Sequence, residues 1–151
     1  MRSILIVDDD ELILKLLART IRNERHSVSV FLDPENAISA CRRQNFDVVI
    51  SDLKMPHMSG VEFLELVLEI SPETRRILIS GYKDSNGVID AFNENIIHKF
   101  VNKPWGNDEI RNLVEEQISI VENLEEGIWV KNIDEFLSLG AIDSEQPIPK
   151  E

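Results

Sequence analysis

Five short runs of apolar residues alternate along this chain with segments that have helical spacing. The runs cover residues 3–7, 27–31, 47–51, 76–79 and 98–102. Those around residues 4, 48 and 77 are continuously apolar, which is typical of strands covered by helices on both faces. Residues 27–31 alternate polar and apolar, which favours an edge strand. A strand followed by a helix five times in succession predicts a doubly wound (βα)5 α/β fold with right-handed crossovers.

The helical segments have recognisable starts. Asp33 before Pro34 predicts the start of the second helix, Ser59 that of the third, Ser85 or Asp84 that of the fourth, and Asn107 that of the fifth. The residues expected to face the core recur every three or four positions. They are Leu12, Ile13, Leu16, Leu17 and Ile21; Ala37, Ile38 and Cys41; Val61, Phe63, Leu64, Val67 and Leu68; Val88, Ile89 and Phe92; and Ile110, Leu113, Val114, Ile118 and Val121.

Composition limits the classes of function. The net charge is −12, which argues against direct nucleic-acid binding, because such binding uses clustered Lys and Arg. No apolar run is long enough to cross a membrane, and a single cysteine fits a reducing compartment, so a cytoplasmic protein is expected. Residues 122–151 hold eight acidic and two basic side chains. This shift predicts a domain over residues 1–122 and an acidic extension over 123–151.

Chemically active side chains follow four of the five runs. They are Asp8, Asp9 and Asp10 after the first, Asp52 after the third, Ser80 and Gly81 after the fourth, and Lys103 and Pro104 after the fifth. In an open parallel sheet, ligands bind in the crevice beyond the carboxyl ends of the strands. We therefore expect these side chains to meet at one place.

The acidic residues of this set predict a metal site. Asp8, Asp9 and Asp52 would repel one another in one pocket unless a cation neutralises them. Hard oxygen ligands favour Mg²⁺, and the backbone carbonyl of Lys54 could complete the shell. Ionised Asp52 would then be both a ligand and a nucleophile toward a phosphoryl group.

The remaining residues of the set suit a phosphoryl group. Lys103 supplies a compact ammonium for a phosphate oxygen, and Ser80 supplies a hydroxyl donor. Gly81 leaves room for access beside them. A cis bond before Pro104 would help to direct the lysine.

These residues resemble the receiver domain of two-component response regulators. The matching stretches are residues 4–9, residues 52–56 with Gly60 eight positions after Asp52, Ser80-Gly81, and Lys103-Pro104. The resemblance covers residues 1 to about 122. It implies a flavodoxin-like sheet with strand order 2-1-3-4-5.

The resemblance also implies a function and a switch. Asp52 would accept phosphate from a histidine kinase or phosphotransfer protein, with Mg²⁺ bound by Asp8, Asp9, Asp52 and the Lys54 carbonyl. Ser80 and Lys103 would contact the phosphoryl group. On phosphorylation Ser80 would move toward the phosphate and Phe100 would turn inward. Such a protein catalyses only its own phosphorylation and dephosphorylation, so it is not expected to be an enzyme in the usual sense.

Signalling would pass through protein contacts to a downstream target or output domain. The resemblance places a possible homodimer or partner contact on the face of the fourth helix, fifth strand and fifth helix. Exposed residues such as Asn93, Glu94 and Arg111 are the expected contacts there. Residues 123–151 contain no recognisable output domain. They are expected to form a helix, with Trp129, Ile133, Phe136 and Leu137 on one stripe, or to be disordered.

Two other functions remain open on the sequence. In a haloacid-dehalogenase-like phosphatase, Asp8 would be the nucleophile and Asp10 the acid/base. Leu12 and the lack of an acidic pair after the lysine disfavour that function. A receiver-shaped docking module that acts without phosphate is the other alternative.

Overall fold

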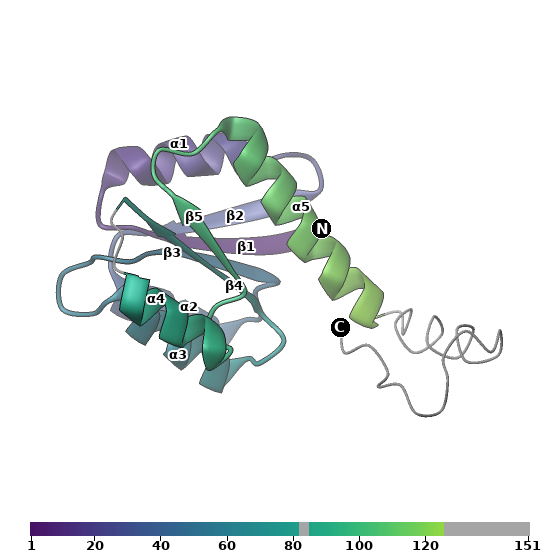
Figure 1. Cartoon of the computed structure of the whole chain (residues 1–151). Helices are drawn as coiled ribbons and strands as arrows, with labels where there is room; N and C mark the ends of the chain where they lie inside the picture. Colours follow the sequence, from purple (N-terminus) through teal and green to yellow (C-terminus); the bar gives the residue numbers. More distant parts are fainter. Residues whose placement is uncertain (82–84, 126–151) are drawn as a thin grey trace, which may run out of the picture.

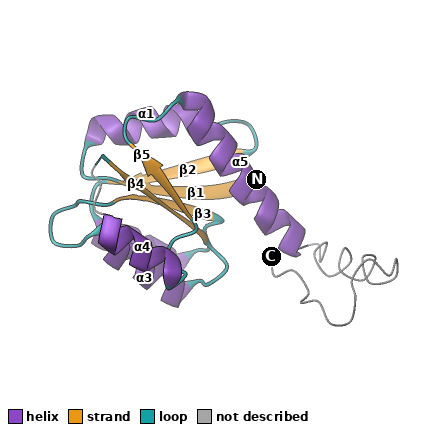
Figure 2. Ribbon diagram, viewed as in Figure 1, coloured by secondary structure: helices purple, strands orange, loops and turns teal. Residues whose placement is uncertain are grey.

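The computed structural model describes residues 1–81 and 85–125, which form one parallel sheet between two layers of helices (Figures 1 and 2). The strands are β1 (Arg2–Val7), β2 (His26–Phe31), β3 (Val48–Asp52), β4 (Arg75–Ser80) and β5 (Lys99–Asn102). The helices in the described ranges are α1 (Glu11–Ile21), α2 (Pro34–Arg43), α3 (Gly60–Ile70), α4 (Ser85–Asn93) and α5 (Asn107–Glu125). The strand order is β2-β1-β3-β4-β5, so the doubly wound flavodoxin-like fold is confirmed.

Helices cover both faces of the sheet. Figure 1 shows α1 and α5 on one side and α2, α3 and α4 on the other. Each strand sends alternate side chains to the two faces. Leu5 and Val7 of β1 therefore join the core under α2, α3 and α4, whereas Ile4 and Ile6 join the core under α1 and α5. The central strands are buried on both faces, as their unbroken apolar sequence predicted.

The sheet edges also follow the sequence pattern. β2, with its alternating residues, lies at one edge, and β5 lies at the other. Asp33 caps α2 by accepting a hydrogen bond from the Glu35 N–H at 2.9 Å. Ser59 and Glu62 form a reciprocal capping box at the start of α3. These caps confirm the predicted starts of both helices.

The inward face of α1 differs from the prediction. Leu14, Leu17, Ala18 and Ile21 are buried, whereas Leu12 is 63% and Leu16 42% exposed. The helix carries apolar residues on two neighbouring stripes, and periodicity alone does not select between them. The rotation of α1 is fixed by its start, where the Asp10 carboxylate accepts from the Leu12 N–H at 2.9 Å.

The prediction for α4 was also wrong in part. Val88 and Ala91 are buried, but Ile89 is 53% and Phe92 39% exposed. This short helix touches the sheet layer along one narrow stripe, so its remaining apolar residues face outward. Asn93 and Glu94 are exposed, as expected.

Helix α5 continues to Glu125, three residues past the expected boundary at residue 122. Its last turns are tied to β1, because Arg2 pairs with Glu125 at 2.8 Å and with Glu122 at 3.4 Å. The expected start at Asp84 and the expected helix with Trp129 lie outside the described residues. Within the described ranges, no helix has the length and apolar character that crossing a membrane requires.

A buried arginine ties two loops at the amino-terminal end of β4. Arg76 is 2% exposed, and its guanidinium donates to the carbonyls of Thr74 (2.6 Å), Ile96 (2.8 Å), Asn95 (3.0 Å) and Pro72 (3.1 Å). Burial, together with the charge of Arg75, lowers the pKa of Arg76 to about 10, so it stays charged at neutral pH. The arginine thus joins the loop before β4 to the loop before β5.

Candidate functional site

Strand register brings the predicted residues to one end of the sheet. Val7 pairs with Ser51, so Asp8 and Asp52 follow side by side. Ser80 ends β4 next to Asn102 of β5. The Lys103 N–H donates to the Ser80 carbonyl at 2.9 Å, which fixes the start of the lysine loop beside β4. The carboxyl ends of these strands, where the chemistry was expected, therefore lie side by side.

Three carboxylates meet at these strand ends. Asp8, Asp9 and Asp52 each place a carboxylate oxygen within 4.8 Å of the others. Asp8 is 2% and Asp52 8% exposed, whereas Asp9 faces solvent. The Asp8 carboxylate accepts from the Asp10 N–H at 2.8 Å, which holds Asp8 in place. Asp10 belongs to no such group, because its own carboxylate caps α1.

Lys103 is the cation of the cluster. Its ammonium lies 2.9 Å from Asp52 Oδ1 and 3.5 Å from Asp8 Oδ2. Burial opposes the charged form, but the hydrogen bond to Asp52 and the charge of Asp8 outweigh it and raise the Lys103 pKa above 10.5. The lysine is therefore fully charged at neutral pH. The peptide bond to Pro104 is cis, as expected.

The site keeps an excess of negative charge. Burial, together with the charge of Asp52, raises the pKa of Asp8 from 3.8 to about 6, although the hydrogen bond from Asp10 opposes this. Among the ion pairs of the described residues, the three acids of the cluster share one cation, Lys103, so negative charge is in excess. Carboxylate oxygens gathered around a single point are the ligands that hard divalent cations prefer. The residues therefore fit a divalent metal.

The other expected site residues lie around this cluster. Ser80 is 1% exposed at the end of β4. A Cβ on Gly81 would lie 3.6 Å from Lys103 Cβ, in ordinary contact, so the glycine leaves space beside the lysine stem. Phe100 is half-buried in β5 and packs against the core under α4. Lys54 is exposed in the loop after β3, and the role of its carbonyl remains a prediction.

Gly60 has a steric role that its place in the sequence motif did not explain. A Cβ on this residue would lie 2.1 Å from the Asp52 carbonyl oxygen and 2.8 Å from Leu78 Cδ1. The Gly60 N–H also donates to the Leu53 carbonyl at 2.7 Å. Only a residue without a side chain lets α3 begin this close to the end of β3.

An apolar groove beside the cluster was missed by the sequence reasoning. It has a volume of about 510 Å³ and lies between α1 and the loop after β5. Ile13 and Leu16 line one side, and Lys103, Pro104 and Trp105 line the other. The exposed stripe of α1 was its only sequence signal, and that stripe had been assigned to the core. The groove thus places an apolar surface next to Lys103.

Comparisons with known proteins agree with this arrangement. Residues 4–115 match the family model described as the response regulator receiver domain. A curated relative, the hydrogenase transcriptional regulatory protein HoxA of Cupriavidus necator, is 36% identical over 116 residues, which are 77% of this chain and 24% of that protein. The chain thus spans about a quarter of the length of the curated relatives that it matches.

Solved structures show the same similarity. An uncharacterized protein from Neptuniibacter caesariensis has a TM-score of 0.78 and 35% identity, with 83% of this chain and 93% of that chain covered. The BeF3-activated DrrB receiver domain has a TM-score of 0.72 and 28% identity, with 79% of this chain and 98% of that chain covered.

Proposed function

Because this chain belongs to the family of response regulator receiver domains, we propose that it signals by accepting a phosphoryl group on Asp52. The observation that carries the proposal is the position of Asp52, which lies between the Lys103 ammonium at 2.9 Å and the carboxylates of Asp8 and Asp9. A nucleophilic carboxylate, a cation for a phosphate oxygen and a set of hard metal ligands thus converge at one strand end.

The chain's own residues divide the work of phosphoryl transfer. A carboxylate oxygen of Asp52 forms a bond to phosphorus as the bond between phosphorus and the donor nitrogen breaks. Lys103, already beside Asp52 Oδ1, moves its hydrogen bond to an oxygen of the transferred group. Ser80, at the end of the neighbouring strand, donates its hydroxyl to another oxygen. Gly81 leaves room for the donor to approach.

Asp8, Asp9 and Asp52 would hold Mg²⁺ through their carboxylates, with the Lys54 carbonyl as a further ligand. The ion would offset the charge on the phosphoryl oxygens during transfer. Asp8 supplies its oxygen from a buried position, where the Asp10 N–H keeps it oriented. The reaction is self-directed, so we propose that the chain catalyses only its own phosphorylation and dephosphorylation.

The phosphodonor is a sensor histidine kinase or a phosphotransfer protein. We place its docking surface on the apolar groove of Ile13, Leu16, Pro104 and Trp105, because this groove reaches Lys103 and thus adjoins Asp52. Leu12, at 63% exposure, extends the apolar surface along α1. A donor bound there reaches the acceptor without crossing the sheet.

The signal leaves by a different face. Phosphate adds about 1.5 to 2 negative charges near pH 7, which draws in Ser80 and Lys103 and lets Phe100 turn inward. β5, which contains Phe100, lies next to β4. We propose that α4, β5 and α5 contact a downstream protein, an output domain or a second copy. The exposed side chains of Ile89 and Phe92 supply the apolar contacts, with Asn93, Glu94 and Arg111 around them.

Direct contact with nucleic acid is not part of the proposal, because the net charge of −12 opposes it. The cytoplasmic location inferred from composition stays a prediction. The phosphatase alternative finds no support in the geometry, because Asp10 caps a helix and its carboxylate lies outside the acidic group. The alternative function, a docking module that acts without phosphate, is tested by the experiment that follows.

The test is phosphorylation of the full chain with acetyl phosphate and Mg²⁺, followed by mass spectrometry to locate the acyl phosphate. We expect one phosphoryl group, on Asp52, which Asp52→Asn abolishes and the exposed control Asp90→Asn retains. A phosphoryl group on Asp8 would support the phosphatase. The absence of any modification, together with partner binding that Asp52→Asn leaves unchanged, would support the docking module.

A further inference from the structure

The outer edge of β2 lacks the features that usually protect an edge strand. Edge strands avoid unwanted pairing by being short or by carrying charged residues, proline or bulges. β2 has six residues, and its residues 27–31 carry no charge and no proline. The opposite edge strand, β5, has only four residues and carries Lys99, which pairs with Glu116 at 3.4 Å.

The backbone of β2 offers hydrogen-bonding groups along this edge. The carbonyls of Arg25 and Phe31 accept bonds from the N–H groups of Arg2 and Asp8, so these residues direct their polar groups toward β1. Successive residues of a strand alternate in direction. The N–H and C=O groups of Val28 and Val30 therefore point away from β1, and no other strand of the described ranges pairs with them.

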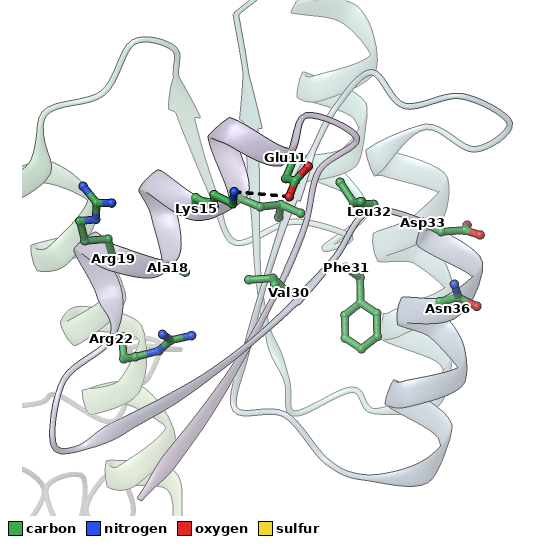
Figure 3. A pocket seen from close by; sticks show the side chains of 11 residues that line it. Glu11, Lys15, Ala18, Arg19, Arg22, Val30, Phe31, Leu32, Asp33 and Asn36 are labelled. Carbon is green, nitrogen blue, oxygen red and sulfur yellow. Dashed lines mark ion pairs between the residues drawn. The ribbon is translucent and has the colours of Figure 1, made fainter.

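A groove of about 810 Å³ runs beside this edge, between α1, β2 and the start of α2. Its floor is apolar: Val30, 44% exposed, points toward Ala18 of α1, and Leu32, 51% exposed, lies further along the chain (Figure 3). We call this the β2 groove. The groove lies at the β2 edge of the sheet, and β5 forms the opposite edge, so the groove is separate from the face assigned above to signalling.

The rim of the β2 groove is basic in a strongly acidic protein. Arg22 reaches from the end of α1 toward β2 (Figure 3), and among the described residues it forms no ion pair. Lys15 pairs only with Glu11 on its own helix, at 3.4 Å, with both side chains more than two-thirds exposed. Such an exposed ion pair is weak, so Lys15 can readily exchange Glu11 for another carboxylate. The other acid of the groove, Asp33, is occupied as the cap of α2.

We propose that the β2 groove binds an extended acidic segment of a partner protein, which adds a strand to the sheet. Its backbone would pair with Val28 and Val30, its apolar side chains would cover Val30 and Leu32, and its carboxylates would meet Lys15 and Arg22. Addition of a strand to an open sheet edge is a common mode of peptide recognition, in which the main chain supplies affinity and the side chains supply specificity.

Charge argues against a second copy of this chain as the occupant. Antiparallel pairing of β2 with its equivalent about a two-fold axis keeps both α1 helices on the same face of the joined sheet. Lys15, Arg19 and Arg22 of each copy would then flank one junction, and like charges at such a junction oppose association. An acidic segment has the complementary charge.

The test uses the full chain and a labelled synthetic peptide in which every second residue is in turn valine and glutamate, so that both kinds of side chain lie on one face of the strand. Threonine fills the positions between them, and proline at both ends limits self-association. Fluorescence anisotropy measures affinity, and amide chemical shifts locate the site. We expect saturable binding, with shifts centred on Val28 and Val30, and no binding of the same peptide with lysine in place of glutamate. Equal binding of both peptides, or shifts centred on another face, would overturn the proposal.

Two variants test the two parts of the groove. Arg22→Glu removes the complementary charge of the rim, and Val30→Ser removes the apolar contact of the floor, so each should weaken peptide binding at least about tenfold. The control Arg42→Glu makes the same charge change on the exposed side of α2 and should have no effect. An equal loss in the control contradicts the proposal. The proposal is also contradicted by a dimer that Val30→Ser disperses, or by chemical cross-links from β2 to residues 126–151 in the free protein.

Discussion

Replacing Asp8 by asparagine should make the metal-free protein more stable. Asp8 is 2% exposed, and its pKa rises from 3.8 to about 6 on folding, so its ionised form is disfavoured in the folded protein. At about 1.4 kcal/mol for each tenfold change in an ionisation constant, this rise corresponds to about 3 kcal/mol at neutral pH. Asparagine keeps the shape of the side chain and can still accept the hydrogen bond from the Asp10 N–H.

The other partners of Asp8 are not stranded by this change. Lys103 retains Asp52 at 2.9 Å, so the substitution leaves no unpaired buried cation. With about 2–4 °C of melting temperature for each kcal/mol in a domain of this size, the variant should melt about 6–12 °C above the wild type in EDTA at pH 7.5. Differential scanning calorimetry measures this directly. Asp90→Asn, at an exposed position on α4, is the matched control and should leave the melting temperature unchanged.

The advantage of the variant should depend on pH in a defined direction. Below about pH 4 the carboxyl group is protonated in both the folded and the unfolded chain, so Asp8 costs nothing and the two proteins should be equally stable. Between about pH 4 and pH 6 the unfolded chain loses its proton first, and the wild type becomes progressively less stable than the variant. Above about pH 6 the difference is complete.

Mg²⁺ in large excess should reverse the order, so that the wild type becomes more stable than the Asp8→Asn variant. Binding to the folded wild type alone stabilises it by about 4.1 kcal/mol at a thousandfold excess over the dissociation constant, and the variant has lost one ligand. This gain exceeds the cost of about 3 kcal/mol that ionised Asp8 imposes. A variant that is no more stable than the wild type in EDTA at neutral pH would refute the account of repulsion within the cluster. An advantage that persists at pH 4 would refute it equally.

Three further substitutions test other parts of the structure. Gly60→Ala should lower the free energy of unfolding in urea by about 3 kcal/mol or more and weaken Mg²⁺ binding in calorimetry, because the new methyl group meets the Asp52 carbonyl oxygen. A variant as stable as the wild type would contradict this close approach. Arg76→Met should lower the free energy of unfolding by about 3 kcal/mol or more, because each buried carbonyl left without a donor costs about 1–3 kcal/mol. Arg76→Lys should recover part of this loss. Leu16→Glu should lower kcat/KM for phosphotransfer from the cognate kinase about tenfold, because it charges an exposed apolar contact. The rate with acetyl phosphate should not change, and a loss with both donors would place Leu16 in the folding of the site rather than in docking.

The sequence was sufficient to predict the sheet and the residues of the cluster. Strand ends are marked by an abrupt change from apolar residues to Asp8, Asp52 and Ser80, and a parallel sheet brings such ends together whatever the details of packing. The edge position of β2 was also readable, since only an edge strand tolerates alternating serines. The predicted roles of these residues in phosphoryl transfer are proposals that the experiments above test.

The faces of the helices were less predictable. In α1, Leu12 and Leu16 are four residues apart and Leu14 and Leu17 are three apart, and both spacings fit one face of a helix. The choice between the two stripes depends on how Asp10 starts the helix. In α4, Ile89 and Phe92 fit a core pattern, but a helix of nine residues buries only one narrow stripe. Both misassigned stripes lie on surfaces that we assign to partners. Apolar residues kept for binding follow the same period as those kept for the core.

The buried guanidinium of Arg76 anchors the carboxyl end of α4 to the rest of the fold. It fastens the turn that follows α4 to the turn that follows α3, through carbonyls of Asn95, Ile96, Pro72 and Thr74. The opposite end of α4 begins five residues after Ser80 in the chain. If Asp52 is phosphorylated as proposed, we expect α4 to move most at this end, because the arginine holds the other end in place.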